Sequence, residues 1–175
     1  HPGDTLRSVI DLHSHLLPGI DDGPVGLGDS ITMARLAAAD GIEIVACTPH
    51  RGYRYDTTPG RVTEGIAELQ PHIDAAGIPV RLVSGLEIAI DRAIAMDEDE
   101  LRAATFGGNG RWLLIEMPFK GWPLELPDLL TALELRGFGA VIAHPERAES
   151  VQSMPDRMRD IVGRGALVQL TAASL

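Results

Sequence analysis

The 175-residue chain contains a single cysteine, Cys47, and only 4% aromatic residues. One thiol can form neither an internal disulfide nor a zinc site with several thiolates, and a reducing compartment such as the cytoplasm is therefore expected. Scarce aromatic side chains argue against a platform on which nucleic-acid bases stack. The composition thus excludes the disulfide-rich and thiolate-zinc classes of small protein.

Positive charge and long hydrophobic runs are also lacking. The formal net charge is −10, whereas a nucleic-acid-binding protein would show a basic patch, so no nucleic-acid partner is expected. No stretch approaches the eighteen or more apolar residues of a membrane-spanning helix, and we expect no membrane insertion. A phosphorylated substrate would have to be captured locally, by a metal ion or by a few arginines, against this overall negative field.

Strand-like and helix-like segments alternate along the whole chain. Apolar stretches predict strands over residues 8–15, 43–48, 80–85, 112–116, 140–143 and 166–170. Helical stripes and capping signals predict helices over residues 27–40, 59–76, 89–104, 124–136 and 155–164. Repeated β-then-α units of this kind predict a single α/β domain with a parallel sheet or barrel and helices outside it.

Two histidines end the first predicted strand. His13 and His15 are one residue apart, and because side chains alternate faces along a strand, they should point to the same place. A short turn then leads to Asp21 and Asp22, which supply carboxylate oxygens beside the two imidazoles. This combination predicts a metal site.

Four of the later predicted strands end in a histidine or a carboxylate or are followed by one within two residues, namely His50, Glu87, Glu116 and His144. Barrel enzymes assemble their active sites at the carboxyl ends of their strands. A mixed nitrogen and oxygen set without thiolate suits manganese, iron, zinc or magnesium, and two or three such ions would promote phosphate hydrolysis. Arg51 and Arg147 follow two of these histidines and offer the planar fork that phosphate oxygens favour.

Six short motifs in this order resemble one known family. They are DLHSH from Asp11, DDGP from Asp21, TPHR from Thr48, GLEI from Gly85, LIE from Leu114 and IAHPER from Ile142. Together they resemble the PHP (polymerase and histidinol phosphatase) superfamily. Within it they are most similar to the bacterial metal-dependent protein tyrosine phosphatases of capsule and exopolysaccharide operons.

The resemblance implies a distorted TIM-like barrel over residues 1–175 that holds two or three divalent ions, manganese foremost. It implies hydrolysis of phosphotyrosine on the tail of a tyrosine kinase of capsule or exopolysaccharide synthesis. The positions that match metal ligands are His13, His15, Asp22, His50, Glu87, Glu116 and His144. Arg147 and Arg51 match phosphate-binding positions, and with Asp22 they form the expected catalytic set. Asp21 and His72 match no ligand position, and His72 is expected on the surface of a helix.

One departure from the family pattern concerns the C-terminal part. The family ends with an Asp-x-His ligand pair on a late strand, whereas residues 168–175 resemble only the sixth strand. We therefore expect an incomplete barrel of about six βα units that lacks the last strands. An open barrel leaves an unpaired strand edge, which predicts a homo-oligomer.

Three alternatives remain open at this stage. A cysteine-based phosphatase would need Cys-x5-Arg, but Tyr53 stands where the arginine should follow Cys47. The same fold could instead hydrolyse a small phosphomonoester such as histidinol phosphate. Without the Asp-x-His pair, the chain could also be an inactive metal-binding domain.

Overall fold

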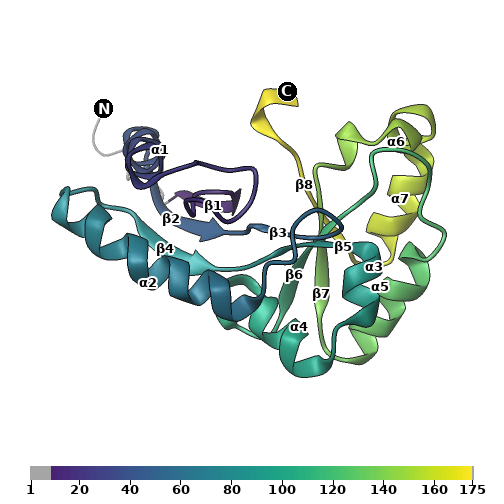
Figure 1. The fold of residues 1–175 in the computed structure, drawn as a ribbon. Helices are drawn as coiled ribbons and strands as arrows, with labels where there is room; N and C mark the ends of the chain where they lie inside the picture. The colour runs from purple at the N-terminus through teal and green to yellow at the C-terminus, as the bar shows by residue number, and fades with distance from the viewer. Residues whose placement is uncertain (1–8, 175) are drawn as a thin grey trace, which may run out of the picture.

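Eight parallel strands form the centre of the structure, a computed structural model that describes residues 9–174 (Figure 1). One sheet has the order β1-β2-β4 and the other the order β3-β5-β6-β7-β8. The strands are β1 (Val9–Ser14), β2 (Ile42–Cys47), β3 (His50–Arg51), β4 (Arg81–Ser84), β5 (Glu87–Ala89), β6 (Trp112–Glu116), β7 (Gly139–Ala143) and β8 (Leu167–Gln169). Ser8, at which the first predicted strand begins, lies outside the described residues.

The two sheets are one curved surface interrupted at two places. The chain passes from β2 to β3 through Thr48 and Pro49, and from β4 to β5 through Gly85 and Leu86. The two interruptions lie side by side, because a Cβ atom on Gly85 would lie only 2.9 Å from Cγ2 of Thr48. Glycine is therefore required at this close approach. The predicted strands 43–48 and 80–85 are consequently each followed by a second short strand.

The strand order follows the chain order around this curve, as an α/β barrel requires. Every strand pair is parallel, and β1 and β8 are the two outer strands of the described part. The barrel is therefore distorted and not closed, which confirms the predicted incomplete barrel of about six βα units.

Helices cover the outside of the sheets, as Figure 1 shows. They are α1 (Leu27–Ala39), α2 (Pro59–Ala75), α3 (Ile90–Ala95), α4 (Glu98–Ala104), α5 (Leu126–Leu135), α6 (Glu149–Ser153) and α7 (Pro155–Gly163). Three 3-10 turns, η1 (Phe106–Gly108), η2 (Pro145–Arg147) and η3 (Ala172–Ser174), complete the set. Within the described residues, no helix combines the length and the hydrophobicity that crossing a membrane would require.

The single helix predicted over residues 89–104 is wrong. The chain leaves the helical conformation at Met96, and the Asp97 side chain accepts a hydrogen bond from the backbone N–H of Glu100 at 2.9 Å. Asp97 is therefore the N-cap of a separate helix, α4, and Met96 is buried in the core. Helix α6 was not predicted.

The hydrophobic core lies between the sheets and the helices. Helix α2 contributes Val62, Leu69 and Ile73, which lie on one helical face and are at most 1% exposed. Cys47 is fully buried in the same core. Burial raises the pKa of its thiol to about 12, so Cys47 is packing and carries no thiolate at neutral pH.

Candidate metal centre

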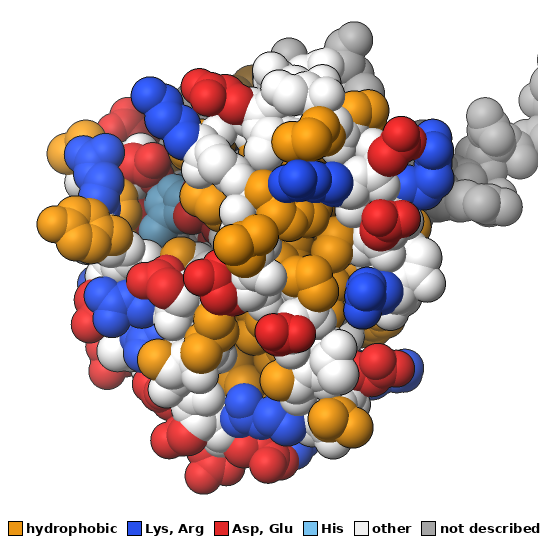
Figure 2. Space-filling model, turned by 90° about the vertical axis from the view of Figure 1, so that its right-hand side faces the viewer, with side chains coloured by type: hydrophobic (Ala, Val, Ile, Leu, Met, Phe, Trp, Pro, Cys, Tyr) orange, Lys and Arg blue, Asp and Glu red, His pale blue; other side chains and the backbone are white. Residues whose placement is uncertain are grey.

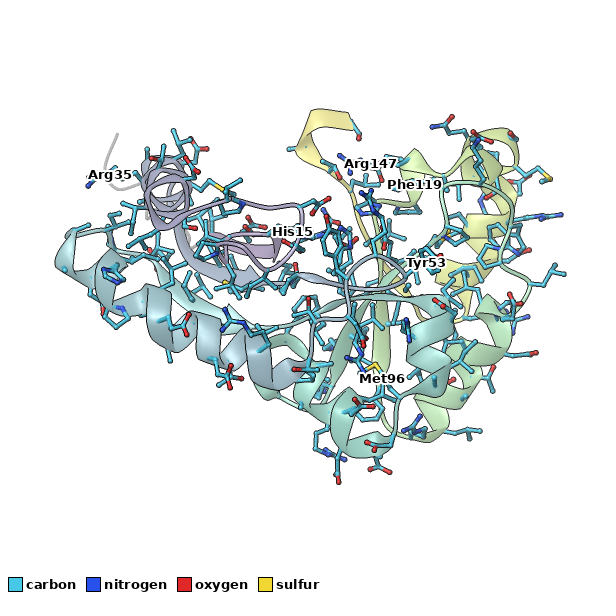
Figure 3. The ribbon with its side chains drawn as sticks, in the orientation of Figure 1. His15, Arg35, Tyr53, Met96, Phe119 and Arg147 are labelled. Carbon is cyan, nitrogen blue, oxygen red and sulfur yellow. The ribbon has the colours of Figure 1, made fainter. Side chains whose placement is uncertain are left out.

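The side chains that the sequence singled out meet at the carboxyl ends of the strands. They belong to β1 and the turn after it, to β3, β5 and β6, and to the residue after β7. Figure 3 shows His15, Tyr53, Phe119 and Arg147 in this central region, with Arg35 far away on α1. Parallel strands end at one edge, which is why residues distant in the chain come together here.

A buried carboxylate is the centre of this cluster. Glu87 is fully buried, and its Oε2 lies 3.0 Å from His13 Nε2, 3.1 Å from His15 Nε2 and 3.2 Å from His50 Nδ1. Its Oε1 lies 2.7 Å from His144 Nε2. Burial by itself would raise the pKa of Glu87, but the imidazoles around it outweigh burial and hold that pKa far below its usual range. Glu87 is therefore ionised, and such a buried charge is tolerated only when compensated.

Asp21 orients one of the imidazoles. Its buried Oδ2 lies 2.6 Å from His15 Nδ1 and accepts a hydrogen bond from the backbone N–H of His50 at 2.9 Å. The other ring nitrogen of His15 consequently faces Glu87. Burial by itself lowers the pKa of His15, but Asp21 and Glu87 together raise it to about 10 in the metal-free protein. The same contacts lower the pKa of Asp21.

Gln169, on β8, orients a second imidazole. Its Oε1 lies 2.8 Å from His13 Nδ1. Histidines that bind metals usually hold their second ring nitrogen against a carboxylate or another acceptor in this way. Sequence reasoning missed both Asp21 and Gln169 in this role. The adjacent Asp21-Asp22 pair was a signal for the first, whereas nothing local pointed to Gln169.

His144 reaches the cluster in a strained conformation. Its φ of 29° is the only positive φ of a non-glycine residue in the described chain. Its backbone N–H donates to the Gln169 carbonyl at 2.8 Å, and η2 begins immediately after it. Such strain occurs where surrounding contacts over-determine a residue, which is common at functional sites.

The remaining candidates differ in position. Asp22 is exposed, and its Oδ1 lies 3.6 Å from His50 Nε2 and 3.7 Å from His15 Nδ1. Oε2 of Glu116, on β6, lies 3.5 Å from Nδ1 of His50. Arg147 lines the same cavity.

Arg51 is not part of the cavity lining, although it follows His50 directly. Its guanidinium group donates to Glu100 at 3.0 Å and to the carbonyl of Thr57 at 3.1 Å. These contacts tie the loop after β3 to α4. His72 lies exposed on α2, as predicted.

The donor groups in the cavity fit divalent metal ions. His13 Nε2 and His15 Nε2 lie 3.2 Å apart, and Glu87 Oε2 is buried without a hydrogen bond of good geometry. Ring nitrogens and a carboxylate converge on this point, and a cation would satisfy them together. In the part of the chain that the structure describes, three groups have ligand atoms that all lie within 4.8 Å of one another: His13, His15 and Glu87; His50, Glu87 and Glu116; and His15, Asp21, Asp22 and His50.

Two spaces with shared lining residues lie at this cluster. The metal-centre cavity, of about 330 Å³, is lined by the histidines, Glu87, Glu116, Arg147, Gln169 and Thr171. A second space of about 630 Å³ lies beside it and shares Asp22, His50, Glu116 and Phe119 with it. Aromatic rings border both spaces. Tyr55 is stacked on His50 with centroids 5.9 Å apart, and Phe119 is stacked on His144 at 6.0 Å.

The fold and this cluster define an α/β-barrel-like protein with a candidate metal centre of histidines and carboxylates. The family model for capsular polysaccharide synthesis, CpsB/CapC, matches residues 9–175, and the chain belongs to that family. It resembles the tyrosine-protein phosphatase YwqE of Bacillus subtilis (strain 168), with 34% identity over 168 residues. That match spans 95% of this chain and 66% of YwqE. The tyrosine-protein phosphatase CpsB of Streptococcus agalactiae serotype III is 21% identical over 168 residues, which are 95% of this chain and 69% of CpsB.

A solved structure confirms the fold. It superimposes with a TM-score of 0.87 at 34% identity and covers 95% of this chain and 68% of the other. It belongs to a report on crystal structures of YwqE from Bacillus subtilis and CpsB from Streptococcus pneumoniae, named there as unique metal-dependent tyrosine phosphatases. The predicted family is thereby confirmed.

Proposed function

We propose that this chain is a metal-dependent phosphatase that hydrolyses phosphotyrosine in a protein. The observation that carries the proposal is the buried Glu87 carboxylate, which four imidazoles surround beside a cavity that Arg147 lines. The expected substrate is a tyrosine kinase of capsule or exopolysaccharide synthesis in the cytoplasm. The names of the relatives support a protein phosphotyrosine as substrate, and the name of the family supports a link to capsular polysaccharide synthesis.

The proposed metal ligands are His13, His15, Asp22, His50, Glu87, Glu116 and His144. These are more ligands than one ion requires, so two or three ions are expected, with manganese first and iron, zinc or magnesium as the other candidates. Divalent ions there would neutralise phosphate charge and make a water molecule more acidic. Asp21 and Gln169 hold the rings of His15 and His13 in the orientation that this requires.

The chain's own residues would position the phosphate ester. Arg147 offers a guanidinium group to the phosphate oxygens, which it can bind in a bidentate manner. Asp22 lines both spaces, so it would lie beside the phenolic oxygen of a bound substrate. Attack of water on phosphorus would release that oxygen as the leaving group. Tyr55 and Phe119 offer flanking faces for the phenyl ring of the substrate. We do not include Arg51, because its guanidinium group is held by Glu100.

The two outer strands support self-association. Among residues 9–174, β1 and β8 each have one edge without a partner strand, and such an edge presents backbone donors and acceptors that a second copy can pair with. We therefore propose a homo-oligomer, and sedimentation velocity at micromolar concentration tests it. A monodisperse monomer would contradict this part of the proposal without affecting the phosphatase activity.

The decisive experiment measures phosphate release with and without added manganese after removal of metals with a chelator. Three substrates are compared: a phosphotyrosine peptide, a phosphoserine peptide and histidinol phosphate. The proposal predicts that turnover depends on the added metal and is fastest with the phosphotyrosine peptide. The control variant His72→Ala, at an exposed position on α2, should keep the wild-type rate and substrate preference. Preference for histidinol phosphate would reassign the substrate. Bound ions without any hydrolysis would favour the inactive metal-binding domain.

A further inference from the structure

The space beside the metal centre is large enough to hold more than a phosphorylated ring. This aromatic groove, as we call it, lies between residues 52–55 on one side and residues 116–123 on the other. Its lining also includes Asp22, His50, Ala89, Ile90, Asp91, Ile94 and Glu125. Its volume of about 630 Å³ exceeds the 330 Å³ of the metal-centre cavity. The two spaces share lining residues, so a ligand in the cavity can continue into the groove.

The groove exposes apolar side chains. Tyr53 is 96% exposed, Ile94 is 54% exposed and Phe119 is 50% exposed. Figure 2, which faces the right-hand side of Figure 1, shows hydrophobic side chains gathered in its middle, with charged side chains around them and a histidine near the left edge. Contiguous exposed apolar surface marks binding sites, and the groove shares Asp22, His50, Glu116 and Phe119 with the cavity of the candidate metal centre.

Two positive side chains stand on opposite sides of this groove close to the metal centre. Arg54 precedes Tyr55, whose ring is stacked on His50, and Lys120 follows Phe119, whose ring is stacked on His144. Both are exposed, and neither has an ion-pair partner among residues 9–174. Lys120 is also the single lysine of a chain whose net charge is −10. Arg54 and Lys120 therefore place two positive charges beside the metal centre of a protein that is negative as a whole.

Four carboxylates line the same groove, and they limit the region of positive charge. Asp22 and Glu116 belong to the metal centre, where histidines face them. Asp91 belongs to α3 and Glu125 directly precedes α5, so neither is on the two segments that carry Arg54 and Lys120. A preference for negative charge is therefore expected close to the phosphorylated ring and not along the whole groove.

We propose that the aromatic groove binds the peptide segment on either side of the phosphotyrosine and selects acidic residues next to it through Arg54 and Lys120. This inference rests on the proposed phosphatase function and names the substrate more closely. The apolar lining receives neighbouring side chains, and the two cations provide the charge complementarity that fixes the preference.

The test uses three peptides of one sequence, in which glutamate, glutamine or lysine flanks the phosphotyrosine on both sides. Values of kcat/KM for each peptide are divided by that for p-nitrophenyl phosphate, measured on the same preparation. We expect the glutamate peptide to exceed the lysine peptide by roughly fivefold, since each exposed charge pair contributes modestly. The double variant R54E/K120E should reverse the order of the peptides.

A matched control variant changes the net charge of the protein by the same amount as R54E/K120E but replaces no residue of the groove. Arg35 on α1 and Arg81 on β4 are exposed and do not line the groove. The variant R35E/R81E should keep the wild-type order of the peptides. Equal kcat/KM ratios for all three peptides in the wild type would overturn the inference. It would also be overturned if R35E/R81E lost the preference for the glutamate peptide to the same extent as R54E/K120E.

Binding separates this inference from the proposed function. Fluorescence polarisation of the same peptides, with a non-hydrolysable difluoromethyl phosphonate in place of the phosphate, needs no turnover. Tighter binding of the glutamate peptide that R54E/K120E abolishes supports the groove even if no hydrolysis occurs. Hydrolysis of p-nitrophenyl phosphate without any peptide preference in rate or binding would reject the groove and leave the phosphatase function standing.

Discussion

The metal-centre cavity and the aromatic groove lie side by side, yet they are built in different ways. The cavity takes its side chains mainly from strand ends, and hydrogen bonds between them hold most of its rings in place. The groove takes its side chains mainly from loops, and several of them, such as Tyr53 and Phe119, are exposed. The comparison indicates that the chemistry belongs to the rigid sheet and substrate choice to the loops.

Removing the charge of Glu87 should have the largest effect, because four imidazoles in the cavity share it. Replacing a residue that merely supports a metal ligand costs about 10- to 100-fold, so Glu87→Gln should reduce kcat/KM by more than about 100-fold. Elemental analysis should find fewer ions per chain. Glu43→Gln, an exposed position on β2, is the control. Wild-type metal content and rate in Glu87→Gln would contradict the cavity as the metal centre.

Arg147→Ala should raise KM by about tenfold, because hydrogen bonds to charged groups contribute about 1.5 to 3 kcal/mol and solvent weakens those of the exposed Arg147. Its metal content should not change. Arg51→Ala is the companion variant, because Arg51 bonds Glu100 and Thr57 outside the cavity. We expect it to lower the melting temperature and to leave KM close to wild type. An Arg51→Ala effect on KM as large as that of Arg147→Ala would restore Arg51 to the catalytic set.

Gln169→Ala tests whether orientation of the rings matters in the cavity. Gln169 holds His13 Nδ1 at 2.8 Å, and loss of such support should weaken metal affinity by about tenfold. Calorimetric titration of the metal-free protein with manganese measures this directly, without an activity assay. Gln152→Ala, on α6 and exposed, is the matched control. Unaltered affinity in Gln169→Ala would mean that His13 is oriented without this contact.

Phe119→Ala tests the loop-built side of the comparison. Phe119 is half exposed and stacks on His144, and aromatic pairs contribute about 0.5 to 1.5 kcal/mol. KM for a phosphotyrosine peptide should rise by about threefold to tenfold, and that for a phosphoserine peptide should change less. Leu135→Ala, at an 84% exposed position on α5, serves as control. Equal effects on both peptides would show that the ring packs without selecting an aromatic substrate.

Cys47 should have the smallest effect. Burial raises the pKa of its thiol from 9.0 to about 12, so iodoacetamide should not modify the folded protein at pH 8 but should modify it in urea. The folded protein keeps the thiol proton to a higher pH than the unfolded chain does. The contribution of Cys47 to the free energy of unfolding is therefore fully present below pH 9 and decreases as the pH rises from 9 to about 12. Cys47→Ala should retain activity and metal content. Loss of activity with normal metal content would revive a cysteine-based mechanism.

Much of the cavity could be predicted from the chain alone. His13 and His15 follow the two-residue period of a strand, and His50, Glu87, Glu116 and His144 end or follow successive strands. The same period explains why Arg51, which the sequence predicted as a phosphate-binding residue, does not line the cavity. His50 and Arg51 are consecutive residues of β3, and consecutive side chains on a strand point to opposite faces.

Other features could not be predicted because they depend on contacts between distant segments. The bond between Gln169 and His13 joins residues 156 positions apart, and no local pattern in β8 indicates it. Asp21 acts through His15 and through the backbone of His50, which the fold brings to it. The break between α3 and α4 depended on the cap at Asp97 within what looked like one acidic helix.

The sequence by itself determined the parallel α/β class, the family and which side chains gather at the strand ends. Local periodicity and the common direction of parallel strands are sufficient for that. The tertiary structure alone decided which arginine lines the cavity, which polar groups orient the imidazoles and how the loops form a groove beside them. Those features arise from side-chain directions and loop packing, which adjacent residues do not specify.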